Sequence, residues 1–313
     1  MLSYIIRRLL YAIPILVGVS LATFVLFYAV TPPEQIARKN ISAKNPTPEQ
    51  LKTWLKEHGY DRPLPEQFKK HMTEVMLFKF GKSDATGEQI WTIIGERWKP
   101  SFMVASLVFF AGLLTEVSFA VFVAYFRGTY IDIWGTFLFV LLMSISYMVY
   151  LIAGQFLLGK VLKYWPLAGF QEGLTGWKFV MMPMVVGVIS GLGYGVRLYR
   201  TFVLEEIGQD YVRTARAKGV PEQQVLFRHV LKNAAIPMLT SVVSVLPTLL
   251  MGSLLLESFF GIPGLGGMTV DAINSQDFAI VRAMVFLGSF LYIIGLILTD
   301  ISYALVDPRV RLE

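Results

Sequence analysis

The chain has 313 residues, of which 55% are hydrophobic and only 16% are charged, and its formal net charge at pH 7 is +6. Soluble domains average about 25% charged residues, so the composition indicates an integral membrane protein and argues against a soluble enzyme. In a membrane protein, a positive excess reflects the enrichment of basic residues in cytoplasmic segments more often than nucleic-acid binding. The absence of cysteine excludes disulfides, thiolate metal sites and cysteine nucleophiles.

Six apolar segments predict six transmembrane helices and therefore an all-α polytopic fold. About 20 apolar residues are needed to cross a bilayer. The first segment follows the basic pair Arg7-Arg8 and is longer than the apolar core of a signal peptide, which has about 7–15 residues, so we expect an uncleaved helix. The six segments are 9–30, 102–126, 133–158, 179–196, 234–256 and 283–306.

The distribution of basic residues predicts that both termini are cytoplasmic. Six crossings place the two termini on the same side of the membrane. Twelve Lys and Arg residues lie in the segments on that side, and four lie in the two short loops on the other side. This bias is typical of cytoplasmic segments. The segments on the side of the termini are 1–8, 127–132, 197–233 and 307–313, and the short opposite loops are 159–178 and 257–282.

The long segment 31–101 predicts a small helical domain on the external side. Loops of more than about 60 residues are translocated largely regardless of their charge. Residues 47–50 have the pattern of a capping box with proline at the first helical position. A second helix is predicted around 68–76, and a third near 90–94. The predicted buried faces comprise Leu51, Trp54, Leu55 and His58; Phe68, Met72, Val75 and Met76; and Ile90, Ile93 and Ile94.

Three glycines share one face of the fourth apolar segment. Gly187, Gly191 and Gly195 form two consecutive G-x-x-x-G patterns, and small residues on one face allow helix backbones to approach closely. The pattern predicts tight helix packing, either against another subunit or within the chain.

A few polar side chains lie inside the apolar segments. Glu116 is in the second segment and Asp300 is in the sixth, and ionisable groups at such depth face protein or water because exposure to lipid is costly. Each carboxylate is a candidate for a transport pathway or for a hydrogen bond between helices. Tyr147 and Tyr150 are likewise candidates for lining a pore or for packing.

The sequence contains no recognisable ATP-binding or catalytic motif. Gly81-Lys82-Ser83 resembles the end of a P-loop, but Met76 stands where that motif requires glycine. The three histidines form no metalloprotease motif, and no G-x-S-x-G is present. If the protein uses ATP, we expect the ATPase to be a separate chain.

A basic, helix-forming stretch from Asp210 to Pro237 precedes the fifth apolar segment. Asp210 is a candidate N-cap, Gly219 suits a helix C′ position with positive φ, and Pro221 can begin a second helix. Held at both ends by membrane helices, such a helix–turn–helix can act as a lever, or its cations can anchor the loop at lipid headgroups. The basic residues are Arg213, Arg216, Lys218, Arg228 and Lys232.

Several stretches resemble the inner-membrane permease subunits of ABC importers for dipeptides and oligopeptides, a family whose close relatives handle nickel or glutathione. The stretches are YIIRRLLYAIPILVGVS, DYVRTARAKG with the following EQQVLFRHVLKNAAIP, LLLESFFGIPGLG and ISYALVDPRVR. They occur in the order of the family over essentially the whole chain. The long segment after the first helix resembles the B-type partner of the permease pair.

The resemblance implies an ABC importer permease of type I in the bacterial inner membrane. Its parts would be the N-terminal end with the first helix (1–30), the external domain (31–101), a five-helix core (102–306) with a cytoplasmic coupling loop (200–233), and the cytoplasmic C-terminus. The chain would bind no cofactor itself. Two ATPase subunits would bind ATP and Mg, a second permease subunit would complete a heterodimer, and an external binding protein would deliver the peptide.

The resemblance also implies a coupling helix that docks in a cleft of an ATPase subunit. Closure of the two ATPase subunits on ATP would switch the permease pair between inward- and outward-facing states. The coupling residues would be Tyr211, Arg213, Thr214, Ala215, Arg216, Lys218, Gly219, Pro221 and Glu222.

The chain departs from the family pattern at four places, one of which is that the stretch from Gly219 to Pro237 is longer than the generic spacing. Arg213-Thr214-Ala215 stands where many ABC importers have Glu-Ala-Ala, TPPEQ (31–35) replaces the usual Pro-Gly-Asp-Pro, and SISYMVY (144–150) lacks the usual proline. The Arg213-Thr214-Ala215 replacement and the longer spacing fit the peptide branch of the family, whereas the other two departures concern cargo and pore. Two other functions are compatible with the residues: an ion-coupled carrier or channel that uses Glu116 and Asp300, and a membrane scaffold whose external domain is the functional part.

Overall fold

The computed structural model describes residues 2–26, 32–41, 46–171, 173 and 176–306. These residues form helices and connecting turns with no β-strand, which confirms the all-α fold. The helices are α1 (Leu2–Phe24), α2 (Pro33–Asn40), α3 (Pro48–His58), α4 (Leu64–Met76), α5 (Ile90–Tyr125), α6 (Tyr130–Ser144), α7 (Tyr147–Gly154), α8 (Trp177–Ile207), α9 (Asp210–Ala217), α10 (Glu222–Gln224), α11 (Leu231–Val245), α12 (Leu254–Phe260), α13 (Leu265–Ser275) and α14 (Phe278–Val306).

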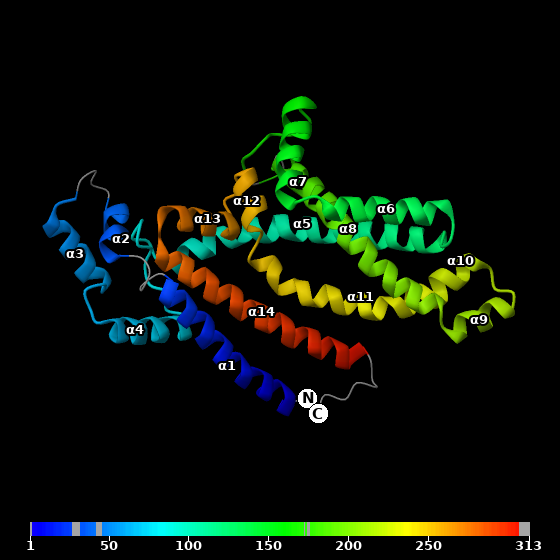
Figure 1. Ribbon diagram of the computed structural model, residues 1–313, viewed down its shortest axis with the longest axis horizontal. Coiled ribbons are helices and arrows are strands. Elements are labelled where there is room, and N and C mark those ends of the chain that lie inside the picture. Colours follow the sequence, from blue (N-terminus) through cyan, green and yellow to red (C-terminus); the bar gives the residue numbers. More distant parts are fainter. Residues whose placement is uncertain (1, 27–31, 42–45, 172, 174–175, 307–313) are drawn as a thin grey trace.

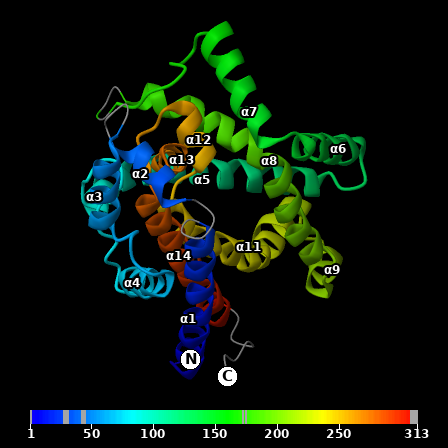
Figure 2. The same ribbon diagram turned by 60° about the vertical axis from the view of Figure 1, so that its left-hand side comes forward.

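The helices are arranged along one long axis. Helices α2, α3 and α4 lie at one end of this axis, and α9 and α10 lie at the other (Figure 1). Between them, α5 packs along α8, and α1 runs antiparallel beside α14 (Figures 1 and 2). The two functional ends that the sequence predicts are therefore separated by the length of the molecule.

Four helices of the described residues are long and apolar enough to cross a membrane, and a bent pair makes a fifth if it counts as one span. The polytopic character is thus confirmed, whereas the count of six is not. The four helices are Ile6–Phe24, Ile90–Tyr125, Trp177–Ile207 and Phe278–Ser302. The end of the first predicted span, 27–30, lies outside the described residues.

The third predicted span is broken rather than straight. Helix α6 and the pair formed by α7 and its π-helical continuation (Gln155–Val161) meet at 90°. Two consecutive residues with extended backbone, Ile145 (ψ 131°) and Ser146 (ψ 141°), turn the chain. The Tyr150 hydroxyl donates a hydrogen bond of 2.6 Å to the carbonyl of Leu142, which also accepts from the Ile145 N–H at 3.3 Å at the end of α6.

The fifth predicted span, 234–256, does not form one helix. The helix that contains α11 tightens to a 3-10 turn at Leu246–Leu250 and ends there. Pro247 lacks an N–H and disfavours continuation of the α-helix, and Gly252 has a φ of 67°. The last three residues of the predicted span, Leu254 to Leu256, belong to α12, which the hydropathy pattern did not separate.

We call the described residues 32–89 the α2–α4 domain. Its capping box is confirmed, since the Thr47 N–H donates to Gln50 Oε1 at 2.9 Å and the Gln50 N–H to Thr47 Oγ1 at 3.4 Å. The predicted third helix is wrong as a separate element. Residues 90–101 form the first turns of α5, because helicity continues through Pro100 even though the local sequence is polar. The three isoleucines of this segment are buried as predicted.

Two buried aspartates fasten the α2–α4 domain to the start of α14. Asp277 accepts hydrogen bonds from the Ser83 hydroxyl and from the backbone N–H groups of Asp84 and Ile280, both at 3.2 Å. Asp84 in turn accepts from the backbone N–H of Ala279 at 3.2 Å. Both side chains are buried, since Asp84 is only 8% exposed and Asp277 only 2% exposed. The domain therefore has a specific, non-local attachment to a membrane helix.

Candidate functional site

The predicted coupling segment forms two helices joined by a tight turn, and we call residues 210–222 the basic hinge. Helix α9 begins at Asp210 itself, so the N-cap is Gln209 and not Asp210 as predicted. The acidic side chain still lies in the first turn, where it interacts favourably with the helix dipole. Gly219 has a φ of 76°, which confirms the predicted left-handed position after α9. Pro221 is the N-cap of α10, one residue before the helix rather than its first residue.

One face of the basic hinge is packed into the largest apolar cluster of the described residues. Val212 is 0% exposed and Ala215 is 7% exposed. They share this cluster with Val121 of α5, Val203 of α8 and Val225, which begins the π-helical stretch before α11. Close packing transmits displacement because interiors are barely compressible, so the hinge is mechanically joined to α5, α8 and the helix leading to α11.

The other face of the basic hinge is polar and exposed. Arg213 Nη1 lies 3.3 Å from Asp210 Oδ1, and both side chains are largely exposed. The Tyr211 hydroxyl donates to a carboxylate oxygen of Glu206. The exposed residues of this face are Tyr211, Arg213, Thr214, Arg216 and Lys218.

Arg216 and Glu222 pair across the turn, which the sequence reading did not predict. Arg216 Nε donates to Glu222 Oε2 at 3.0 Å, and Nη2 donates to Oε1 at 2.5 Å. These hydrogen bonds raise the pKa of Arg216 and lower that of Glu222. An exposed ion pair adds little to stability, but a bidentate pair fixes geometry. A helix-spacing rule could not find it, because the six-residue separation includes the left-handed Gly219.

A second ion pair supports the region next to the basic hinge and was also missed. Arg200 Nη2 of α8 lies 2.6 Å from Asp132 Oδ1 at the start of α6. The other carboxylate oxygen of Asp132 accepts from the Gly128 N–H at 3.1 Å. The pair joins the turn between α5 and α6 to α8, two helical turns before α8 ends. The only sequence signal is that both residues fall in segments predicted to be cytoplasmic.

The predicted glycine face of α8 contacts α5. A Cβ atom at Gly187 would lie 2.8 Å from Val108 Cγ1, and one at Gly191 would lie 3.0 Å from Glu116 Oε1. A Cβ at Gly195 would approach the Glu116 carboxylate to 2.1 Å. The glycines therefore make room for α5 of the same chain, and Glu116 lies against two of them.

The structure does not bring the candidate pathway residues together. Asp300 of α14 forms an ion pair with Arg8 of α1 at 3.0 Å, whereas Glu116 contacts α8. Tyr147 lines a cavity of about 270 Å³ between α5, α8 and the 3-10 turn after α11, and Tyr150 closes the end of α6. In the part of the chain that the structure describes, no group of three or more His, Asp or Glu side chains is placed to hold a metal ion.

Comparison with known proteins gives consistent matches over the whole chain. The family model for the binding-protein-dependent transport system inner membrane component matches residues 116–312, and the model for its N-terminal region matches residues 1–120. A probable peptide ABC transporter permease protein of Sinorhizobium fredii is 30% identical over 98% of this chain and 99% of its own length.

Two further relatives are named for specific cargo classes. A dipeptide transport system permease protein of Lactococcus lactis is 30% identical over 100% of both chains. An oligopeptide transport system permease protein of Bacillus subtilis is 28% identical over 99% of this chain and 100% of its own length. The similarity thus spans the whole chain and not a single motif.

Proposed function

The chain belongs to the binding-protein-dependent transport system inner membrane component family, and we propose that it is the transmembrane permease subunit of an ATP-driven ABC importer of peptides. The cargo class rests on the names of the full-length relatives, which are peptide, dipeptide and oligopeptide transport permeases. In this function the chain forms half of the solute path and couples to separate ATPase subunits. No observation favours a self-sufficient carrier or a scaffold.

The observation that carries the coupling role is the two-sided construction of the basic hinge. Its apolar face is anchored in the cluster that joins α5, α8 and the start of the α11 helix, while its cationic face is exposed. An ATPase surface that grips the cationic face would move these helices as one body. A chain with no recognisable ATP-binding motif needs such a docking surface for a separate ATPase.

Orientation follows from the same assignment. The basic hinge would face the cytoplasm with both termini, and the α2–α4 domain would lie outside, at the opposite end of the long axis (Figure 1). The partners would be a second permease subunit, two ATPase subunits that bind ATP and Mg, and an external substrate-binding protein. Glu116 and Tyr147 remain proposals for the path, whereas Asp300 is engaged by Arg8.

Reversal of one hinge charge tests the coupling role. Arg213 is exposed, and among the described residues its one ion pair is with Asp210 of the same helix at 3.3 Å. Arg213→Glu should therefore weaken ATPase docking without unfolding the chain. We expect uptake of peptide to fall at least several-fold while the amount of inserted protein stays unchanged. Lys52→Glu, an exposed reversal on α3, is the matched control.

Cross-linking gives an independent readout of the same contact. Because the chain contains no cysteine, Thr214→Cys supplies a single thiol on the exposed hinge face. We expect a bifunctional reagent to link it to an ATPase chain in membranes of the source bacterium. Capture of lipid alone, together with normal uptake by the Arg213→Glu variant, would refute the assignment.

A further inference from the structure

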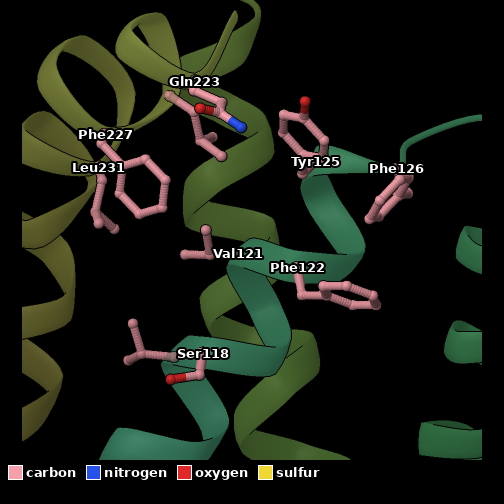
Figure 3. A pocket seen from close by; sticks show the side chains of 10 residues that line it. Ser118, Val121, Phe122, Tyr125, Phe126, Gln223, Phe227 and Leu231 are labelled. Atoms are coloured by element: carbon pink, nitrogen blue, oxygen red, sulfur yellow. The ribbon is translucent and has the colours of Figure 1, made fainter.

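An apolar groove lies beside the basic hinge, where α5 ends. Its volume is about 500 Å³, and it is formed by the last turns of α5 and by the helix that leads from α10 into α11. Figure 3 shows Phe227 and Leu231 on one side and Phe122 and Phe126 on the other, with Val121 between them. Phe227 is 61% exposed and Phe122 is 51% exposed, so the groove is open along its length and presents aromatic rings.

The two ends of the groove differ in polarity. Tyr125 and Gln223 lie together at the end nearest the turn after α5, and Ser118 lies at the opposite end (Figure 3). The Ser118 hydroxyl is engaged by the carbonyl of Leu114 at 2.6 Å, so it offers little to a ligand. The groove therefore suits an amphipathic molecule, with the polar part of that molecule beside Tyr125 and Gln223.

Three cations directly follow residues that line the groove. Arg127 follows Phe126, Arg228 follows Phe227, and Lys232 follows Leu231. All three are exposed, and none forms an ion pair with another described residue. Their charge complements an anionic headgroup rather than a neutral one, since basic residues near a membrane surface attract acidic lipids.

The position of the groove fits the boundary between hydrocarbon and headgroups. The apolar helix α5 ends at Tyr125, and the chain turns at Gly128, which has a φ of 79°. Tyrosine is enriched at that boundary because it combines an apolar ring with a polar tip. An acyl chain lying toward Val121 would leave its headgroup at the level of Arg127.

We propose that this groove binds one acyl chain of an anionic phospholipid, with the phosphate held among Arg127, Arg228 and Lys232. The assignment of this lipid to the inner leaflet rests on the proposed function, while binding itself does not. The groove lies between α5 and the helix that follows the basic hinge. The bound lipid would therefore stabilise the packing of these two helices, against which the hinge rests. A neutral lipid and a segment of a partner chain are the competing occupants.

Native mass spectrometry of the purified transporter tests this proposal. The complex is exchanged into mild detergent containing equal amounts of phosphatidylglycerol and phosphatidylcholine, and retained lipid is counted per complex. We expect phosphatidylglycerol to be retained preferentially. Phe227→Ala should reduce its retention several-fold, and Arg228→Gln should abolish the preference over phosphatidylcholine.

Two matched variants control for size and charge away from the groove. Phe110→Ala removes a ring that is 62% exposed on another part of α5, and Lys178→Gln removes an exposed cation at the start of α8. Both should retain lipid as the wild type does. Equal retention by all five proteins, equal retention of the two lipids by the wild type, or a groove filled by a partner chain would overturn the proposal. Failure of the transport assignment would instead appear as loss of ATPase cross-linking to the hinge.

Discussion

At the scale of single residues, a glycine outside the predicted pattern allows the backbones of α8 and α6 to approach closely. A Cβ atom at Gly193 would lie 2.6 Å from the Met143 backbone nitrogen and 2.7 Å from the Phe139 carbonyl oxygen of α6. At Gly195 the obstacle is the Glu116 side chain, which can rotate. The spacing rule identified α8 as a close-packing helix, but the helix uses a second face, toward α6, that no glycine repeat marks.

This difference predicts that Gly193→Ala is more destabilising than Gly195→Ala. The backbone of α6 has to move to admit the new methyl group, and overpacking of this kind costs about 1–3 kcal/mol. Thermal unfolding of the purified protein in detergent should therefore show the lowest midpoint for Gly193→Ala. Gly18→Ala in α1, where nothing lies within 4 Å of the new Cβ, is the control. Equal midpoints for Gly193→Ala and Gly195→Ala would contradict the prediction.

At the scale of elements, local features could be predicted from the sequence and non-local ones could not. The capping box at Thr47 and the left-handed Gly219 depend on neighbours within a few residues, so their patterns suffice. The break between α6 and α7 has no proline or glycine to mark it and is supported by Tyr150. Hydropathy also missed the early start of α5, because helix formation does not require apolar residues.

The basic hinge shows the same limit, since its turn was predictable but the pair that holds the turn was not. The Arg216–Glu222 pair spans both helices of the hinge. Arg216→Glu places two carboxylates face to face, which would open the turn and lower peptide uptake several-fold. The double variant Arg216→Glu, Glu222→Arg should restore most of the uptake, because it rebuilds the pair with its charges exchanged.

The comparison separates two roles for Arg216. If the ATPase reads the charge of this side chain directly, the exchanged pair will be as inactive as the single variant. Restoration would show that the main role is to hold α10 against α9. Arg213→Glu, which breaks no comparable pair, should not be rescued by Glu222→Arg.

At the scale of the whole molecule, the α2–α4 domain is held by contacts that join distant parts of the chain. Ser83 and Asp277 are 194 residues apart in sequence, and Val75 of α4 shares an apolar cluster with Phe286 and Ile293 of α14. A domain of this size has a small apolar core and would be only marginally stable by itself. The sequence predicted α3 and α4 but not α2. It did not predict their support, because nothing local encodes a partner on the last membrane helix.

The attachment of this domain should weaken as pH rises. Burial and the neighbouring Asp277 raise the pKa of Asp84 to about 7, whereas an unfolded aspartate titrates near 4. Between these values the attached state binds more protons than the detached state, so the free energy of detachment falls as pH increases from about 4 to about 7 and is flat above. Burial lowers the pKa of His71 to about 4, which gives the opposite slope between about 4 and 6.5, so Asp84 has to be isolated by substitution.

Asp84→Asn provides that isolation, because the amide oxygen can still accept from the Ala279 N–H and the His71 contribution is common to both proteins. Hydrogen exchange of the α3 and α4 amides, measured between pH 5 and 8 and corrected for the intrinsic exchange rate, reports opening of the domain. We expect opening of the wild type relative to Asp84→Asn to increase by at least tenfold from pH 5 to pH 7, and then to level off. A ratio that is constant over this range would mean that Asp84 does not carry a proton in the attached state, and that the contact with Asp277 is held without one.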